Sequence, residues 1–319
     1  MTIQKTPVVA ALALFCCVLW GSAFPCIKIG YEWFAIEGAG SQMLFAGCRF
    51  FCAGVMTFLL FSLKERKLLT IKKSSIPAVF GQGVLQTTIQ YFFFYLGLAN
   101  TTGAKGSIIT ASNAFFSIII AHFLMKEERF TWKKAIGCIV GFAGVVVVNL
   151  TPGAWSSGFA WNGEGFVLLC AIAYGASSVT TKLLSKREQP ESITAYQLMI
   201  GGAILMIMGY LASGTIGSFT IKSAILFFYL AFLSTLSFTI WAILLKYNPV
   251  SKVAPFGFTI PVFGTALSGL LLHEEILTWN NLAALVLVSC GIIWVNLELP
   301  KKRGRGGNEN DKRPVLRRT

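Results

Sequence analysis

The chain has 319 residues, of which 55% are hydrophobic and 13% charged, and its mean hydropathy is +0.68. A soluble domain carries about a quarter charged residues, so this composition excludes a water-soluble globule, and its ample apolar surface excludes a disordered chain. The net charge of +14 would suit nucleic acid, but the Lys and Arg residues flank apolar runs or follow Pro300, as in membrane proteins with a cationic cytoplasmic side.

Ten apolar runs follow one another along the chain, and each is long enough to cross a membrane as a helix. A membrane β-barrel would instead have alternating segments of about ten residues. We therefore predict an all-α integral membrane protein with ten transmembrane helices. They are expected near residues 8–30, 42–63, 77–98, 105–125, 134–151, 164–184, 192–213, 223–246, 252–272 and 280–299.

The cationic residues divide unevenly between the connections. When alternate connections are grouped, 23 of the 27 Lys and Arg residues fall on one side. Because cationic connections stay in the cytoplasm, we predict a multi-pass protein of the cell (inner) membrane with both termini cytoplasmic. The connections near 64–73 and 126–134 are then cytoplasmic, and those near 151–162 and 273–279 are external. Residues 300–319 are predicted to form a disordered, basic cytoplasmic tail.

Residues 126–149 and 273–296 repeat each other at a fixed offset of 147 residues. Identical pairs include Glu127/Glu274, Glu128/Glu275, Thr131/Thr278, Trp132/Trp279, Gly144/Gly291 and Asn149/Asn296. Upstream, an offset of 154 relates Gly21 to Gly175 and Lys28 to Lys182. Each unit holds five spans, an odd number, so the second unit must enter the membrane upside down. We predict two inverted five-helix repeats, residues 1–151 and 152–299, which is typical of transporters.

Short motifs in these spans resemble those of a known family. They are Trp20-Gly21-Ser22-Ala23-Phe24 for its W-G-s-x-F signature, Arg49-Phe50 for its R-F, the acidic pairs Glu127-Glu128 and Glu274-Glu275 for its L-x-E, and Pro261 for a proline midway in span nine. The sequence thus resembles EamA-type carriers of the drug/metabolite transporter superfamily. In span four Ala114 replaces the corresponding proline, so the resemblance does not decide whether that helix is kinked. The resemblance implies an inner-membrane carrier that commonly exports metabolites, often amino acids or related compounds.

Arg49 is the charged residue placed deepest in an apolar run. It lies about eight residues into its span, roughly 12 Å along the helix, where a charge costs about 2.5–3.5 kcal/mol. No Asp or Glu lies at comparable depth. Arg49 therefore either binds an anionic group of a substrate or snorkels to the outer headgroups or to backbone carbonyls of span one.

Glutamines and aromatic residues mark the interior of spans three and eight. Gln82, Gln86 and Gln90 recur every four residues, so they share one helix face. Amides that faced lipid would be unsatisfied, so this face either bonds to another helix or lines a watery cavity. Aromatic side chains along a cavity suit a substrate with an apolar portion. The predicted substrate-binding set is Arg49, Gln86, Gln90, Tyr91, Asn113 and Trp241.

The motifs of enzymes and ATPases are missing from the sequence. It has no H-E-x-x-H, no G-x-S-x-G and no P-loop, so we predict that the protein is not an enzyme. The eight cysteines lie in apolar runs without a C-x-x-C, and the two histidines are far apart. They are expected to hold no metal, and no cofactor is expected.

We predict a secondary carrier with alternating access that exports an amino acid or a related amphiphilic compound. Its partners are a small-molecule substrate and the lipid bilayer, with no nucleic acid. A channel, or a partner or sensor subunit, is the alternative, although no charge ring or carbonyl filter is evident. Without a deep carboxylate, the carrier either follows the substrate gradient or binds protons elsewhere, at His122 or on the substrate. Proton coupling and the choice between monomer and homodimer stay open.

Overall fold

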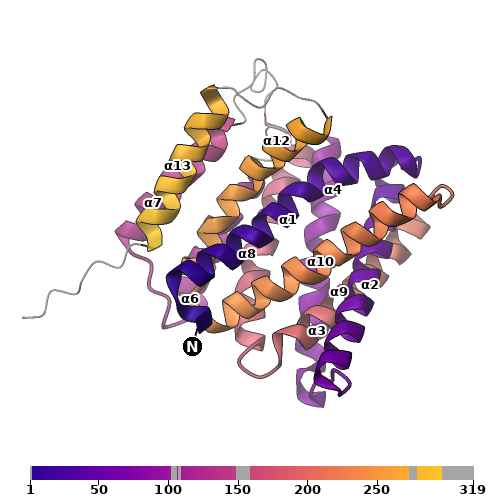
Figure 1. Cartoon of the computed structure of the whole chain (residues 1–319), viewed down its shortest axis with the longest axis horizontal. Helices are drawn as coiled ribbons and strands as arrows, with labels where there is room; N and C mark the ends of the chain where they lie inside the picture. The colour runs from indigo at the N-terminus through magenta and orange to yellow at the C-terminus, as the bar shows by residue number, and fades with distance from the viewer. Residues whose placement is uncertain (1, 102–105, 107–108, 149–158, 273–278, 297–319) are drawn as a thin grey trace, which may run out of the picture.

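The computed structural model describes residues 2–101, 106, 109–148, 159–272 and 279–296 (Figure 1). Within these residues every regular element is helical. This follows from the composition, because a bilayer core offers no partner to backbone N–H and C=O groups, and a helix satisfies them internally. The predicted tail at 300–319, and most of the two predicted external connections at 151–162 and 273–279, lie outside the described residues.

All ten predicted spans are helical where the structure describes them. The first unit contains α1 (Thr6–Trp33), α2 (Gly38–Glu65), α3 (Ile76–Gly83), the π-helix η3 (Val84–Ile89), α4 (Gln90–Ala99), α6 (Asn113–Leu124) and α7 (Trp132–Val148). The second contains η4 (Trp161–Gly165), α8 (Phe166–Leu184), α9 (Pro190–Leu211), α10 (Ile221–Tyr247), α11 (Val250–Val253), the 3-10 helix η5 (Ala254–Phe258), α12 (Thr259–Leu272) and α13 (Trp279–Asn296). Among the described residues, five uninterrupted helices are long and apolar enough to cross a membrane, namely α1, α2, η4 with α8, α9 and α10.

The second spans of the two units, α2 and α9, pack side by side and antiparallel (Figure 1). Glycines bring their backbones together: a Cβ on Gly47 would lie 2.8 Å from the Gly202 carbonyl oxygen, and one on Gly54 would lie 2.7 Å from that of Ala195. A Cβ on Gly209 would lie 2.8 Å from the oxygen of Gly40. Close approach through small residues stabilises helix pairs in lipid, where no hydrophobic force drives association.

The fifth spans, α7 and α13, form a second antiparallel pair at one edge of the molecule (Figure 1). A Cβ on Gly137 would lie 3.0 Å from the Gly291 carbonyl oxygen, and one on Gly144 would lie 2.9 Å from that of Ala284. The offset of 147 exchanges these two contacts, because it maps residue 137 onto 284 and 144 onto 291. Counterpart helices would be parallel if both units had the same orientation. Their antiparallel packing therefore confirms two inverted repeats; the unit boundaries at 151 and 299 stay a prediction.

Spans four and nine change helical geometry at equivalent positions. In span four the Ser112 hydroxyl donates to the carbonyl oxygen of Ile109 (2.5 Å), and α6 begins at the next residue. In span nine the Thr259 hydroxyl donates to the carbonyl oxygen of Phe256 (2.7 Å), where η5 gives way to α12. The offset of 147 maps the donor Ser112 onto Thr259 and the acceptor Ile109 onto Phe256, so the two bonds are counterparts. A hydroxyl that bonds back to the preceding turn often accompanies a bend, and span four is interrupted although Ala114 replaces the usual proline.

The cationic connections meet on one face of the molecule. There the Lys72 ammonium donates to the Arg187 carbonyl oxygen (3.1 Å), Lys186 lies 3.4 Å from Glu127, and Lys252 donates to the Gln4 carbonyl oxygen (3.3 Å). We call this the basic face, formed by residues 2–5, 66–75, 125–131, 185–189 and 246–252. Its contacts agree with the grouping from the Lys and Arg count, and its cytoplasmic orientation stays a prediction.

Candidate functional site

A chain of aromatic side chains crosses the interior between the two units. It draws on α4, α2 and α1 of the first unit and on α10 of the second. Successive ring centroids lie 4.5–6.2 Å apart in the order Tyr95, Tyr91, Phe50, Phe238, Trp20 and Trp241. Most of these contacts are edge-on or tilted, which suits the quadrupoles of the rings. This aromatic chain links Tyr91 and Trp241, two of the predicted site residues, across the boundary between the units.

Arg49 lies beside the middle of the aromatic chain. It is 11 residues from the start of the 28-residue helix α2, or about 16 Å along its axis, and only 3% exposed. Its guanidinium carbon is 4.3 Å from the centroid of the Phe50 ring, within cation–π distance. Its Nε finds no hydrogen-bond partner among the described residues. Because the head group is buried near the middle of the helix, the structure favours a role inside the protein over snorkelling.

Other buried polar atoms around the aromatic chain also lack partners. Within the part of the chain that the structure describes, Gln90 Oε1, Ser237 Oγ, Thr239 Oγ1 and Trp241 Nε1 make no hydrogen bond. Gln90 begins α4, and the other three lie within five residues of each other on α10. A buried polar group left unsatisfied costs about 1–3 kcal/mol. Such atoms fit a site that receives its partners from a ligand or from water.

Gln86 takes part in a network between span three, where α3 continues into the π-helix η3, and α8. The amide of Gln82 donates to Gln86 Oε1 (2.7 Å) and to Thr181 Oγ1 (2.7 Å), while Thr180 donates to Gln82 Oε1. These side chains are buried or partly buried. The bonds of Gln82 with Thr180 and Thr181, and a longer bond from Thr181 Oγ1 to Gln86 Oε1 (3.5 Å), cross from the first unit to the second. For Gln86 the contacts favour the interhelical interpretation of the glutamine face, whereas Gln90, one turn further on, keeps a free acceptor.

Asn113 lies at the interruption of span four, as the first residue of α6, and is 8% exposed. Its Oδ1 is 3.7 Å from the place where a Cβ on Gly257 would be, so it faces the 3-10 segment η5 of span nine. The structure thus gathers Arg49, Tyr91 and Trp241 along the aromatic chain and places Asn113 at the crossing of the two interrupted spans.

Sequence reasoning missed a buried ion pair on the basic face. Lys182 Nζ lies 3.2 Å from Glu128 Oε1 and also donates to the Asn248 carbonyl oxygen. The same carboxylate accepts bonds from the Val250 N–H and from the Ser251 hydroxyl (2.9 Å). We call these five residues the Glu128 junction. The repeated Glu-Glu pair and its matching Lys are the sequence signal for this junction. Depth within a span does not reveal it, because Glu128 lies after the end of α6.

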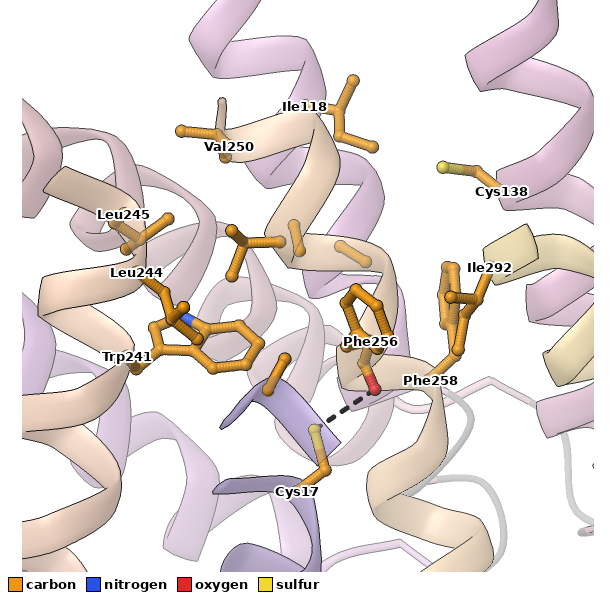
Figure 2. Packing of buried hydrophobic residues seen from close by; sticks show 14 of the residues in the cluster. Cys17, Ile118, Cys138, Trp241, Leu244, Leu245, Val250, Phe256, Phe258 and Ile292 are labelled. Atoms are coloured by element: carbon orange, nitrogen blue, oxygen red, sulfur yellow. Dashed lines mark hydrogen bonds between the residues drawn. The ribbon is translucent and has the colours of Figure 1, made fainter. Parts of the chain in front are cut away.

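A hydrophobic core seals the interior next to the Glu128 junction (Figure 2). It unites side chains from α1, α6, α7, α10, α11, η5 and α13, including Cys17, Ile118, Leu244, Val250 and Phe256. The Cys17 thiol donates to the Phe256 carbonyl oxygen (3.2 Å), as the dashed line in Figure 2 marks. Val250 belongs both to this core and to the Glu128 junction, and Trp241 belongs both to this core and to the aromatic chain.

A cleft of about 450 Å³ opens on the basic face between the connections 65–72 and 185–192. Its lining includes Lys67, Lys72, Lys186, Arg187 and Lys246. None of the six predicted substrate-binding residues lines it, so it belongs with the cationic connections and not with the candidate site.

The comparison with known families decides the class of protein. The model of the EamA-like transporter family matches residues 8–150 and 161–297, one match in each half of the chain. The chain belongs to the EamA-like transporter family. This EamA protein is accordingly a multi-pass membrane transporter and not an enzyme, and the resemblance seen in its motifs is confirmed.

Relatives and a solved structure agree with this family. An uncharacterized transporter of Bacillus subtilis (strain 168) is 24% identical over 86% of this chain and 92% of its own. A protein of Salmonella typhimurium named a probable amino-acid metabolite efflux pump is 26% identical over 88% of this chain and 92% of its own. A solved crystal structure superposes with a TM-score of 0.76 at 16% identity, covering 90% of this chain and 96% of that one; it supports the fold alone.

Proposed function

We propose that this EamA protein is a secondary carrier with alternating access that exports an amino acid or a related amphiphilic metabolite across the cell (inner) membrane. Both termini and the basic face are cytoplasmic in this proposal, as the bias of Lys and Arg toward cytoplasmic connections predicts. The substrate binds at the aromatic chain between the two units. Arg49 holds its anionic group, and Gln90, Tyr91, Asn113 and Trp241 orient the remainder, while Gln86 positions span three against α8.

The observation that carries this proposal is the set of unpaired buried polar atoms beside the aromatic chain. Arg49 Nε and Trp241 Nε1 offer two donors, and Gln90 Oε1 offers an acceptor. An amino acid brings a carboxylate to accept from donors, an ammonium to donate, and a side chain to contact the rings. A site that is mostly apolar with a few polar groups is typical of small-molecule binding.

Alternating access follows from the inverted repeat. Two similar units of opposite orientation supply half-sites that face opposite sides, so rocking one unit against the other exposes the centre to each side in turn. The name of the Salmonella typhimurium relative, a probable amino-acid metabolite efflux pump, supports export and the substrate class. Transport follows the substrate gradient, or couples to protons at His122 or on the substrate. Monomer and homodimer are equally compatible with these contacts.

The test begins with a thermal-shift screen of the purified full-length protein against the twenty amino acids and their close metabolites. Uptake of the ligand with the largest shift is then measured in inverted vesicles at matched protein levels. We expect Arg49→Gln to raise the apparent KM by about 10- to 100-fold, because a charged hydrogen bond contributes about 1.5–3 kcal/mol. Arg49→Lys should recover part of the loss, since a point charge lacks the guanidinium fork.

The matched control is Arg129→Gln, which removes an exposed arginine from the basic face and should leave KM unchanged. Equal transport by the wild type, Arg49→Gln and Arg49→Lys would refute the assigned role of Arg49. Absence of a thermal shift with every amino acid and metabolite would refute the substrate class.

A further inference from the structure

The Glu128 junction joins the two units at the basic face. Glu128 follows α6 of the first unit, whereas Lys182, Val250 and Ser251 belong to α8 and α11 of the second. Glu128 is 4% exposed. Its contacts with Lys182, Val250 and Ser251, and that of Lys182 with the Asn248 carbonyl oxygen, hold the end of span four against α8 and α11. Any movement that separates the units at this face must break the contacts of Glu128 with Lys182, Val250 and Ser251.

Stability alone is a weak explanation for this arrangement. Burying two charges removes them from water, and replacing a buried ion pair by apolar residues is often neutral or stabilising. The sequence nevertheless duplicates both charges, since Glu275 matches Glu128 at the offset of 147 and Lys28 matches Lys182 at the offset of 154. Glu275 lies outside the described residues. A carrier that closes its two faces in turn has a use for a charge pair between its units at each face.

An ion pair suits a contact that forms and breaks repeatedly. In the closed state Glu128 and Lys182 contact each other, and Glu128 also accepts from the Val250 N–H. In an open state both charges are hydrated. These gains offset each other, because desolvation cancels much of the attraction between buried charges. The two states then differ little in free energy, which is the condition for a conformational equilibrium that a substrate can shift.

We propose that Glu128 and Lys182 form a latch that closes the basic face and separates each time this face opens during transport. The latch rests on the alternating access of the proposed function but not on the substrate or on Arg49. It acts together with the hydrophobic core of Figure 2, which fills the interior next to the Glu128 junction. When the latch opens, that core separates, and Cys17, now fully buried, meets water.

Cys17 is therefore a native reporter of the open state. The full-length protein, reconstituted in vesicles of phosphatidylethanolamine and phosphatidylglycerol, is treated with membrane-permeant N-ethylmaleimide, and mass spectrometry of its peptides gives the labelling rate of each cysteine. We expect Lys182→Met to raise the rate at Cys17 by about tenfold or more, because removing one partner leaves an unpaired buried charge that disfavours the closed state.

Three controls separate a latch from a general loss of stability. Cys170, which is buried in α8 toward the opposite face, should keep its slow labelling. Lys186→Met breaks the exposed pair with Glu127 on the same face and should leave Cys17 unchanged, because exposed pairs contribute little. The double variant Glu128→Gln/Lys182→Met leaves no unpaired charge, so Cys17 should react more slowly in it than in Lys182→Met.

A selective rise at Cys17 in Lys182→Met would support the latch. An unchanged rate at Cys17, or rates that rise together at Cys17 and Cys170 with a lower melting temperature, would overturn it in favour of a purely structural pair. Because labelling needs no substrate, the latch is tested even if no amino acid binds, and a failure of the substrate assignment is recognised separately in the thermal-shift screen.

Discussion

Replacing Arg49 by methionine should make the protein more stable and its substrate binding weaker. A charge in the middle of a span costs about 2.5–3.5 kcal/mol on the insertion scale, and the unpaired Nε of Arg49 adds to the desolvation penalty of a buried donor. Against this, the cation–π contact with Phe50, 4.3 Å from the guanidinium carbon, contributes about 0.5–2 kcal/mol. Methionine keeps most of the apolar stem, so the net gain is about 1–2 kcal/mol.

The assay compares unfolding of the wild type and Arg49→Met in the same detergent, with and without the amino acid that binds best. We expect a melting temperature higher by about 2–4 °C without ligand and a ligand-induced shift that largely disappears. A binding site keeps its charge at the expense of stability, whereas a structural arginine does not. A variant that melts lower than the wild type, with an unchanged ligand shift, would show that Arg49 serves the fold.

Three further outcomes follow from the fold. Gly202→Ala should destabilise the protein by about 1–3 kcal/mol in unfolding experiments, because its Cβ would lie 2.5 Å from the Phe51 nitrogen. The control Gly81→Ala, with open space around it, should be neutral or slightly stabilising. Equal effects of the two changes would contradict the α2–α9 packing. A cysteine at position 156 should react with an impermeant maleimide in intact cells and one at position 74 should not; the reverse result would invert the topology. Truncation after Pro300 should leave transport intact, since the glycine-rich, cationic sequence after it predicts no packed core; lost transport at normal expression would disprove this.

The sequence was sufficient for the architecture because the bilayer imposes strong, local rules. Run length and the repeat at offset 147 predicted the spans and their inversion, and the contacts of Gly137 and Gly144 agree with that repeat. The sequence does not decide whether span four is interrupted, since the usual proline is Ala114. The structure interrupts the helix at Ser112, whose hydroxyl bonds back to Ile109; the same kind of bond from Ser22 lies inside the unbroken α1, so the residue type alone does not predict the break.

The candidate site was less accessible to sequence reasoning because its members come from distant spans. The sequence marks Arg49 as a deep charge and Trp241 as an aromatic residue that could line a cavity, but nothing in it places both along one aromatic chain through Phe50, Phe238 and Trp20. Gln86 and Gln90 share a helix face, yet Gln86 accepts a bond from Thr181 of α8, whereas Gln90 keeps a free oxygen. That difference depends on which residues of α8 lie opposite, which helical spacing does not determine.

The contact between Gly47 and Gly202 has a consequence for how the chain assembles. At an offset of 155 residues, Gly47 matches its own contact partner Gly202, and the Gly54–Ala195 and Gly40–Gly209 contacts are exchanged for one another. Such self-matching is the property of an isologous interface, the kind that joins the subunits of a twofold homodimer. The polypeptide is, in this geometric sense, a dimer whose protomers share one backbone. The two halves, produced as separate chains with cuts in the 149–158 stretch, should accordingly recognise each other in the membrane without the connection between them.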